Sequence, residues 1–201
     1  DMGKFEVRRD AITKANAPTA SGGGNLGITL PDMSLFGGNG ADRPATGISW
    51  NEAARFVNWL NTSQGYQPAY KFSTQPGQGG YSPSQNISLW TPGDVGYDAT
   101  NRFRSSLANY VLPSANEWYK AAYCSPSGVY FNYPTGSDGP PTAVTSGTAA
   151  GTAVYQQARA HGPADVASAG GTSPYMTVGQ GGNVMEWLET EADLVNNNNV
   201  G

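Results

Sequence analysis

The side chains that most often bind transition metals or act as nucleophiles are scarce in this chain of 201 residues. It contains one cysteine, Cys124, and one histidine, His161. A single residue of each kind excludes an internal disulfide, a Cys/His zinc cluster and a multi-histidine iron or copper site within this sequence. We therefore interpret Cys124 as a small, partly buried packing residue and His161 as a surface or loop residue.

Acidic side chains are the next candidates for chemistry. Four aspartates lie in loops rich in glycine and proline: Asp94, Asp98, Asp138 and Asp165. Aspartate in such loops commonly accepts hydrogen bonds from the neighbouring backbone and so stabilises a turn. The loops favour this structural role over acid or base catalysis.

The first helix is predicted by a capping box, the pattern S-x-x-E in which the serine hydroxyl and the glutamate carboxylate bond free amide groups at the helix start. Ser49 and Glu52 predict a helix that ends near Asn61. Its apolar residues recur at helical spacing and should form one buried stripe, made of Trp50, Ala53, Ala54, Val57 and Leu60. Arg55 falls outside that stripe, so we expect it at the surface.

A second capping box is formed by Ser114 and Glu117. Trp118 begins the apolar stripe of this helix, and Cys124 marks its end. Residues 5–17 predict the end of a strand followed by a further helix.

The remaining sequence predicts loops. Residues 18–47 should form a long ordered loop, pinned by an apolar island of Leu30, Met33, Leu35 and Phe36. Residues 64–109 and 125–180 predict irregular loops, with one short strand in the first. Tyrosine in 64–109 is typical of binding surfaces, because it offers a large contact area at low entropic cost, and plain packing is the alternative.

Composition indicates a globular, loop-rich protein. Charged residues make up 13% and aromatic residues 11% of the chain, and it has 27 glycines and 14 prolines. We predict a single domain over 1–201, with a core at about 2–190 and a low-complexity tail at 191–201.

The net charge of −4 and scattered basic residues disfavour nucleic-acid binding, and no apolar run is long enough to span a membrane. Low charge and abundant small polar residues favour an extracellular, cell-surface or periplasmic location.

Three ordered segments carry a family resemblance: PATGISWNEAARFVNWLN at 44–61, YVLPSANEWYKAAY at 110–123 and GQGGNVMEW at 179–187. They resemble the formylglycine-generating enzyme, or sulfatase-modifying-factor, family, in which the last segment reads GNVWEW. The segments MGKFEV at 2–7 and YFNYPTGSD at 130–138 are similar to a bacterial subgroup of secreted proteins that often carry a C-terminal cell-surface sorting signal.

The resemblance implies an α+β, C-type-lectin-like fold. Two amphipathic helices should pack on small twisted antiparallel sheets, among many loops. Such domains normally continue with further strands after the GNVWEW segment. We therefore expect an incomplete domain whose edges near 2–7 or 183–190 are covered by another segment or chain.

The resemblance also leads to two alternative hypotheses about function. The family's oxidases convert a protein cysteine to formylglycine with copper held by two cysteine thiolates, and a related branch uses iron bound by histidines. Cys124 matches neither copper ligand, and His161 alone cannot form the iron site, so we expect no copper or iron site here. The leading hypothesis is a non-catalytic extracellular or cell-surface module that binds a protein or glycan, or self-assembles. The alternative is a formylglycine-generating-type oxidase whose catalytic cysteine segment is absent from this chain.

The resemblance further implies a structural Ca²⁺ at the third segment. Asn183 and Glu186 match the motif, and Gly182 allows a carbonyl to turn inward; hydrogen bonds to nearby amides are the alternative role. Met185 replaces the usual tryptophan, and Gly179 stands where related sequences often have aspartate. The other motif residues are assigned structural roles, namely Ser49, Trp50, Glu52, Ser114, Glu117, Trp118 and Trp187.

Overall fold

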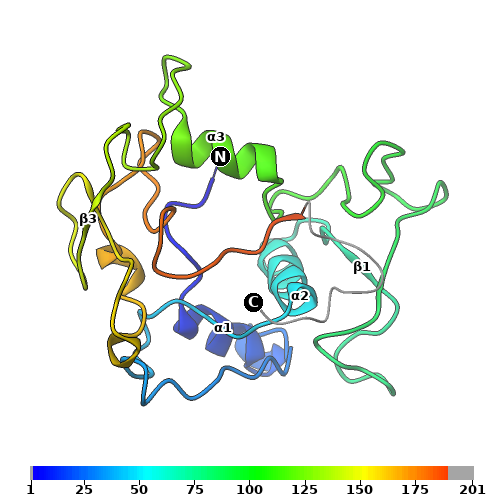
Figure 1. Ribbon diagram of the computed structural model, residues 1–201. Coiled ribbons are helices and arrows are strands. Elements are labelled where there is room, and N and C mark those ends of the chain that lie inside the picture. The colour runs from blue at the N-terminus through cyan, green and yellow to red at the C-terminus, as the bar shows by residue number, and fades with distance from the viewer. Residues whose placement is uncertain (1, 190–201) are drawn as a thin grey trace. The chain divides into compact units, whose positions relative to one another are not determined.

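The structure, a computed structural model, describes residues 2–189 (Figure 1). Its helices are α1 (Arg9–Asn16), α2 (Trp50–Thr62) and α3 (Ala115–Tyr123), with the short 3-10 helices η1 (Thr19–Ser21), η2 (Arg159–His161) and η3 (Val166–Ser168). Its strands are β1 (Lys71–Phe72), β2 (Ile87–Ser88), β3 (Thr142–Ala143) and β4 (Thr152–Ala153). Turns and loops make up most of the rest, which confirms the predicted loop-rich α+β class. The tail predicted at 191–201 lies outside the described residues.

Two small sheets form, and only one is antiparallel as predicted. Strand β1 pairs antiparallel with β2, whereas β3 pairs parallel with β4. The parallel pairing follows from two slanted backbone bonds, from the Thr142 N–H to the Gly151 carbonyl and from the Val144 N–H to the Ala153 carbonyl.

Residues of the described chain group into two compact units. Unit 1 comprises residues 2–10, 30–46 and 113–186, and unit 2 comprises residues 11–29, 47–112 and 187–189. A single domain over the whole chain therefore stays a prediction. Within residues 2–189, no helix combines the length and the apolar character needed to cross a bilayer.

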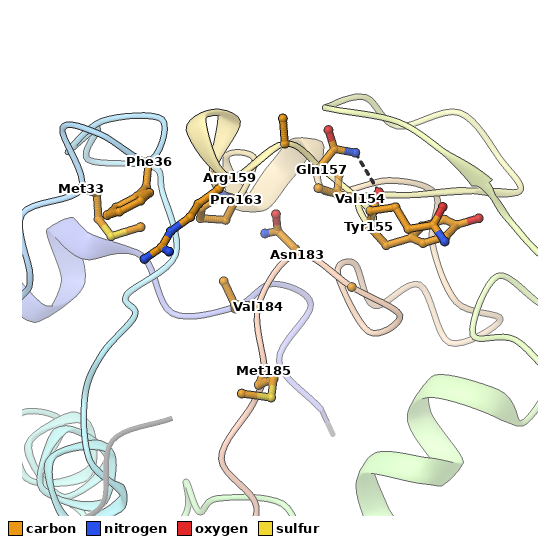
Figure 2. A pocket seen from close by; sticks show the side chains of 14 residues that line it. Met33, Phe36, Val154, Tyr155, Gln157, Arg159, Pro163, Asn183, Val184 and Met185 are labelled. Atoms are coloured by element: carbon orange, nitrogen blue, oxygen red, sulfur yellow. Dashed lines mark hydrogen bonds between the residues drawn. The ribbon is translucent and has the colours of Figure 1, made fainter.

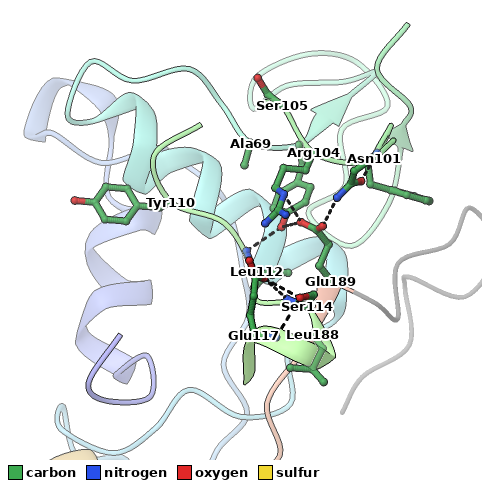
Figure 3. A network of polar contacts seen from close by, with 12 residues as sticks. Ala69, Asn101, Arg104, Ser105, Tyr110, Leu112, Ser114, Glu117, Leu188 and Glu189 are labelled. Atoms are coloured by element: carbon green, nitrogen blue, oxygen red, sulfur yellow. Dashed lines mark hydrogen bonds and ion pairs between the residues drawn. The ribbon is translucent and has the colours of Figure 1, made fainter. Parts of the chain in front are cut away.

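Both predicted capping boxes are present. The Ser49 backbone N–H donates to the Glu52 carboxylate at 2.7 Å, and the Glu52 N–H donates back to the Ser49 hydroxyl. Ser114 and Glu117 repeat this exchange at the start of α3 (Figure 3). Each pair satisfies two amide donors that would otherwise have no helical acceptor, so each fixes where its helix begins.

The core of unit 2 forms around α2 and the loop that follows it. Its buried members are Trp50, Ala54, Val57, Ala69, Tyr70 and Phe72. The rings of Trp50 and Tyr70 meet edge to face, with centroids 5.2 Å apart. The Trp50 indole N–H donates to the Leu188 carbonyl at 2.9 Å, and the Trp187 indole N–H donates to the Ile48 carbonyl at the same distance. These bonds fix residues 187–189 to the start of α2 within unit 2.

Arg55 departs from the sequence prediction, because its side chain is buried with 2% exposure instead of lying at the surface. The guanidinium donates to three backbone carbonyls, those of Thr74, Pro83 and Gln85. It also lies 3.8 Å from the centre of the Phe72 ring. Carbonyl and aromatic partners replace the water that a buried guanidinium loses. Arg55 therefore holds the loop of residues 74–85 against α2.

The N-terminal predictions hold in part. Helix α1 forms, but the strand expected before it is reduced to one bridge between Arg8 and Pro44. The apolar island does not pin the following loop as predicted, since Leu35 is 78% exposed. Polar bonds hold that loop instead: the Asn39 amide accepts from the Met33 N–H and donates to Asp32.

Candidate functional site

Asn183 links three segments of unit 1. Its backbone N–H donates to the Val154 carbonyl at 2.7 Å, and its side-chain oxygen accepts from the Ala164 N–H at 2.7 Å. Its side-chain amide donates to a carboxylate oxygen of Glu6 at 2.8 Å. The backbone of Asn183 has φ = 64°, a left-handed conformation that asparagine tolerates better than most residues. Asn183 therefore organises the local fold through hydrogen bonds.

Two partly buried glutamates accompany Asn183, and the pKa of each is raised. Burial raises the pKa of Glu6 to about 7, although hydrogen bonds from Asn183 and from the Val184 backbone act in the opposite direction. Burial, followed by the charge of Glu6, raises the pKa of Glu186 to about 8. Two carboxyl groups that influence each other in a buried setting are costly to ionise without a cation nearby.

Buried oxygen atoms without a hydrogen-bond partner occur in this part of the chain. Among residues 2–189, one carboxylate oxygen each of Glu6 and Glu186 and the amide oxygen of Gln180 are buried without a hydrogen-bond partner. Carboxylate and amide oxygens are the ligands that Ca²⁺ prefers. No three His, Cys, Asp or Glu side chains in the described chain gather closely enough to hold a metal, so a Ca²⁺ ion here would need amide and main-chain oxygens as well.

Two glycines give this segment its close packing. A side chain at Gly182 would meet the Val154 carbonyl oxygen at 2.2 Å, so only glycine fits there. A side chain at Gly179, which also has φ = 85°, would meet the Glu6 carboxylate at 2.6 Å. The space that an aspartate at 179 would need is thus taken by Glu6. Sequence reasoning missed Glu6, although a charged residue between Phe5 and Val7 was a signal that could have identified it.

A cavity of about 550 Å³ opens in unit 1 beside Asn183 (Figure 2). Its apolar walls include Met33, Phe36, Val184 and Met185, the last of which is 83% exposed. This volume lies within the range of about 300 to 1,000 Å³ typical of ligand sites. The cavity therefore has the size and the apolar surface of a binding pocket.

Arg159 supplies the charge of this pocket. Its guanidinium lies 4.8 Å from the centre of the Phe36 ring, and Figure 2 shows it directed toward Phe36 and Met33. In the described part of the chain, it forms no hydrogen bond or ion pair. The ring orients the cation without neutralising it, so the positive charge is available to an anionic group of a ligand.

The pocket wall also contains strained backbone. Gln156 has φ = 55°, and with Asn183 it is one of five non-glycine residues in the described chain that have positive φ. Such conformations cost about 1 to 3 kcal/mol and concentrate at ligand-binding sites. Two of the five, Gln156 and Asn183, line this pocket.

The other sequence candidates have structural roles. Cys124 is 2% exposed and its thiol donates to the Ser125 carbonyl, while His161 is exposed in η2. Asp94 accepts from the Thr91 backbone and hydroxyl, as the turn interpretation requires, and also from Lys71. These bonds, led by the one from Lys71, lower the pKa of the Asp94 carboxyl to about 2.

Glu189 is a buried polar centre of unit 2 that sequence reasoning missed. Its carboxylate accepts from the Tyr70 hydroxyl at 2.9 Å and from the Asn101 amide at 2.5 Å, and it pairs with the Arg104 guanidinium at 3.5 Å (Figure 3). The Tyr70 hydroxyl in turn accepts from the Leu112 N–H at 2.8 Å. Glu189 therefore fastens the segment after Trp187 into the core of unit 2.

Comparison with known proteins identifies the family of this chain. A family model described as the sulfatase-modifying factor enzyme 1-like domain matches residues 32–199. No curated protein and no solved structure matches the chain. The matched region includes the three segments at 44–61, 110–123 and 179–187, and it spans more than half of the sequence. The chain therefore belongs to the family of sulfatase-modifying factor enzyme 1-like domains.

Proposed function

We propose that this chain is a non-catalytic binding module that acts outside the cytoplasm, at the cell surface, in the periplasm or in the extracellular space. It binds a segment of a partner protein in the pocket of unit 1. The observation that carries this proposal is the pocket of about 550 Å³, where the Arg159 guanidinium lies against the Phe36 ring and forms no ion pair among residues 2–189. The location rests on the low charged fraction of 13%.

The pocket chemistry favours an acidic, apolar peptide. Met33 and Met185 offer flexible, polarisable surfaces that adapt to varied apolar side chains. Arg159 offers planar donors that match a carboxylate. A peptide with an aspartate or glutamate beside a leucine or phenylalanine would use both features.

The oxidase reaction is the weaker alternative for these residues. The copper site that the resemblance implies for the oxidases needs two cysteine thiolates, and this sequence holds one cysteine, the buried Cys124. The binding proposal needs no such pair.

Binding can be tested with matched peptides and isotope-labelled protein. We expect Ac-Leu-Asp-Leu-NH₂ to shift the amide signals of residues 154–159 and 182–185, and its Asn counterpart to bind more weakly. Arg159→Gln should remove the difference between the two peptides, and Arg102→Gln, at an exposed arginine of unit 2, should retain it. An acidic peptide that leaves those signals unmoved would contradict the proposal.

We further propose that Glu186, with Glu6 and the amide and carbonyl oxygens around Gly182 and Asn183, holds a structural Ca²⁺. The unpartnered buried oxygens of Glu6 and Glu186 support this proposal. Ion at a hundredfold excess over its dissociation constant would add about 2.7 kcal/mol of stability. At roughly 2 to 4 °C per kcal/mol, a chelator should then lower the melting temperature by about 5 to 11 °C.

The calcium test uses two substitutions. Glu186→Gln keeps the side-chain shape but removes the charge, so it should abolish most of the chelator effect. Asp42→Asn, at a carboxylate whose side chain is 62% exposed, should leave the effect unchanged. Identical melting curves with and without chelator, in protein first loaded with calcium, would leave Glu186 with only a structural role.

A further inference from the structure

Unit 2 contains a second cavity, of about 320 Å³, that shares no residue with the pocket described above. It lies between α2, β1 and the loops that flank them. Its floor is made of four aromatic side chains, Trp59, Tyr70, Phe72 and Trp90. Its volume falls at the lower end of the range for small-ligand sites, about 300 to 1,000 Å³.

Three of the four rings of the floor are buried. Tyr70 is 1%, Phe72 7% and Trp90 8% exposed, and the Trp90 indole N–H is occupied by a bond to the Ala69 carbonyl. Trp59 is more accessible, and a bond from its indole N–H to the Gly22 carbonyl holds its ring in place. Trp59 is therefore the ring of the floor that a ligand can reach, while the three buried rings pack the wall.

The rim of this cavity offers polar groups with spare capacity. The Lys71 ammonium donates one bond, to Asp94 at 2.6 Å, and retains two further donors. The Thr62 hydroxyl donates to carbonyls within α2 and keeps its own acceptor lone pairs. The side-chain oxygen of Gln75 has no hydrogen-bond partner among the described residues. A ligand with several hydroxyl groups around a compact ring would meet these groups.

The charge in the walls is positive. Lys71 and Arg55 line the cavity, and none of its described lining residues is acidic. Asp94 pairs with one Lys71 N–H and leaves two donors, while Arg55 is bonded to backbone carbonyls and forms no ion pair within the described chain. A buried cation that is paired only with dipoles leaves a positive potential in the adjacent cavity. An anionic group on the ligand is therefore favoured over a neutral or cationic one.

We propose that this cavity binds a pyranose sugar that carries a carboxylate. The C–H face of such a ring stacks on Trp59, its hydroxyl groups bond Thr62 and Gln75, and its carboxylate lies toward Lys71. The site is independent of the peptide pocket, because it uses other residues in the other unit.

The test compares methyl β-D-glucuronide with methyl β-D-glucoside, which differ only in the carboxylate. We expect the glucuronide to shift the Trp59 indole signal in a two-dimensional NMR titration, with a lower dissociation constant than the glucoside. Trp59→Leu keeps an apolar side chain but removes the flat face, and a lost ring contact of about 0.5 to 1.5 kcal/mol predicts roughly twofold to twelvefold weaker binding. Tyr66→Leu, at a 45% exposed ring outside the cavity, is the matched control and should bind as the parent does.

A second variant tests the charge separately. Lys71→Met should remove the preference for the glucuronide and leave glucoside binding unchanged. Equal binding of both sugars by the parent protein would overturn the assignment of an acidic sugar. An unmoved Trp59 signal, or movement only with indole or a proline-rich peptide, would overturn the sugar site altogether. Neither result would bear on the peptide pocket, whose signals lie at 154–159 and 182–185.

Discussion

Removal of one hydroxyl group, by Tyr70→Phe, should destabilise the protein strongly. Tyr70 is 1% exposed, and its hydroxyl donates to Glu189 and accepts from the Leu112 N–H. Its loss leaves a buried carboxylate oxygen and a buried amide without this partner, and each such group costs about 1 to 3 kcal/mol. For two groups the total is about 2 to 6 kcal/mol, and because Glu189 keeps its contacts with Asn101 and Arg104 we expect the lower half of that range, about 2 to 4 kcal/mol.

The assay is denaturant unfolding followed by tryptophan fluorescence, with a melting curve alongside. The denaturation midpoint should fall while the slope stays constant, and the melting temperature should drop by about 4 to 16 °C. Tyr66→Phe removes a hydroxyl from a 45% exposed ring and should change little. In combination with Glu189→Gln, Tyr70→Phe should cost less than the sum of the two, because both variants break one network. A Tyr70→Phe protein within about 0.5 kcal/mol of the parent would refute the reasoning.

Three other perturbations follow from the same contacts. Calcium-free protein should lose stability as pH rises from about 4.5 to 8, because folding keeps protons on Glu6 and Glu186 that the unfolded chain releases. The loss should be at most about 1.4 kcal/mol per pH unit for each glutamate. In urea titrations, the double variant Glu6→Gln with Glu186→Gln should show a flatter dependence of stability on pH. Arg55→Met should lower the free energy of unfolding by about 2 to 4 kcal/mol, since three carbonyls lose their donor. An unchanged denaturation midpoint would contradict a stabilising role for the buried Arg55 guanidinium. Ser49→Ala should lower the free energy of unfolding by about 1 to 2 kcal/mol, and Ser114→Ala should lower it less, because Ser49 is fully buried and Ser114 is partly exposed. A larger loss of melting temperature for Ser114→Ala than for Ser49→Ala would count against the capping argument.

The helices and the family could be predicted from the sequence because both depend on local, ordered patterns. Ser49 with Glu52, and Ser114 with Glu117, mark helix starts through bonds made within four residues. The loops gave no such signal. Arg55 occupies a position that helical periodicity assigns to the surface, and the Phe72 ring and the distant carbonyls of residues 74–85 bury it.

The candidate site was predictable in part for the same reason. Asn183 was identified from the motif, but its partner Glu6 lies 177 positions away in the sequence. Glu189 follows the motif by two residues, yet its bond to Tyr70 spans 119 positions. Pairings of this kind depend on the tertiary fold, and a single sequence holds no periodic pattern that reveals them.

The very short strands have a consequence for how the native state opens. Each ladder, β1 with β2 and β3 with β4, joins only two residues on either side. Many amides outside the helices are instead protected one at a time, by a turn or by a side chain such as Asn61, which accepts from the N–H groups of residues 109 and 110. Hydrogen exchange in these loops should therefore proceed through many small openings, and not through the release of whole sheets. A bound ligand would then slow exchange only at the few amides that it touches, so exchange can map a binding site on this fold almost residue by residue.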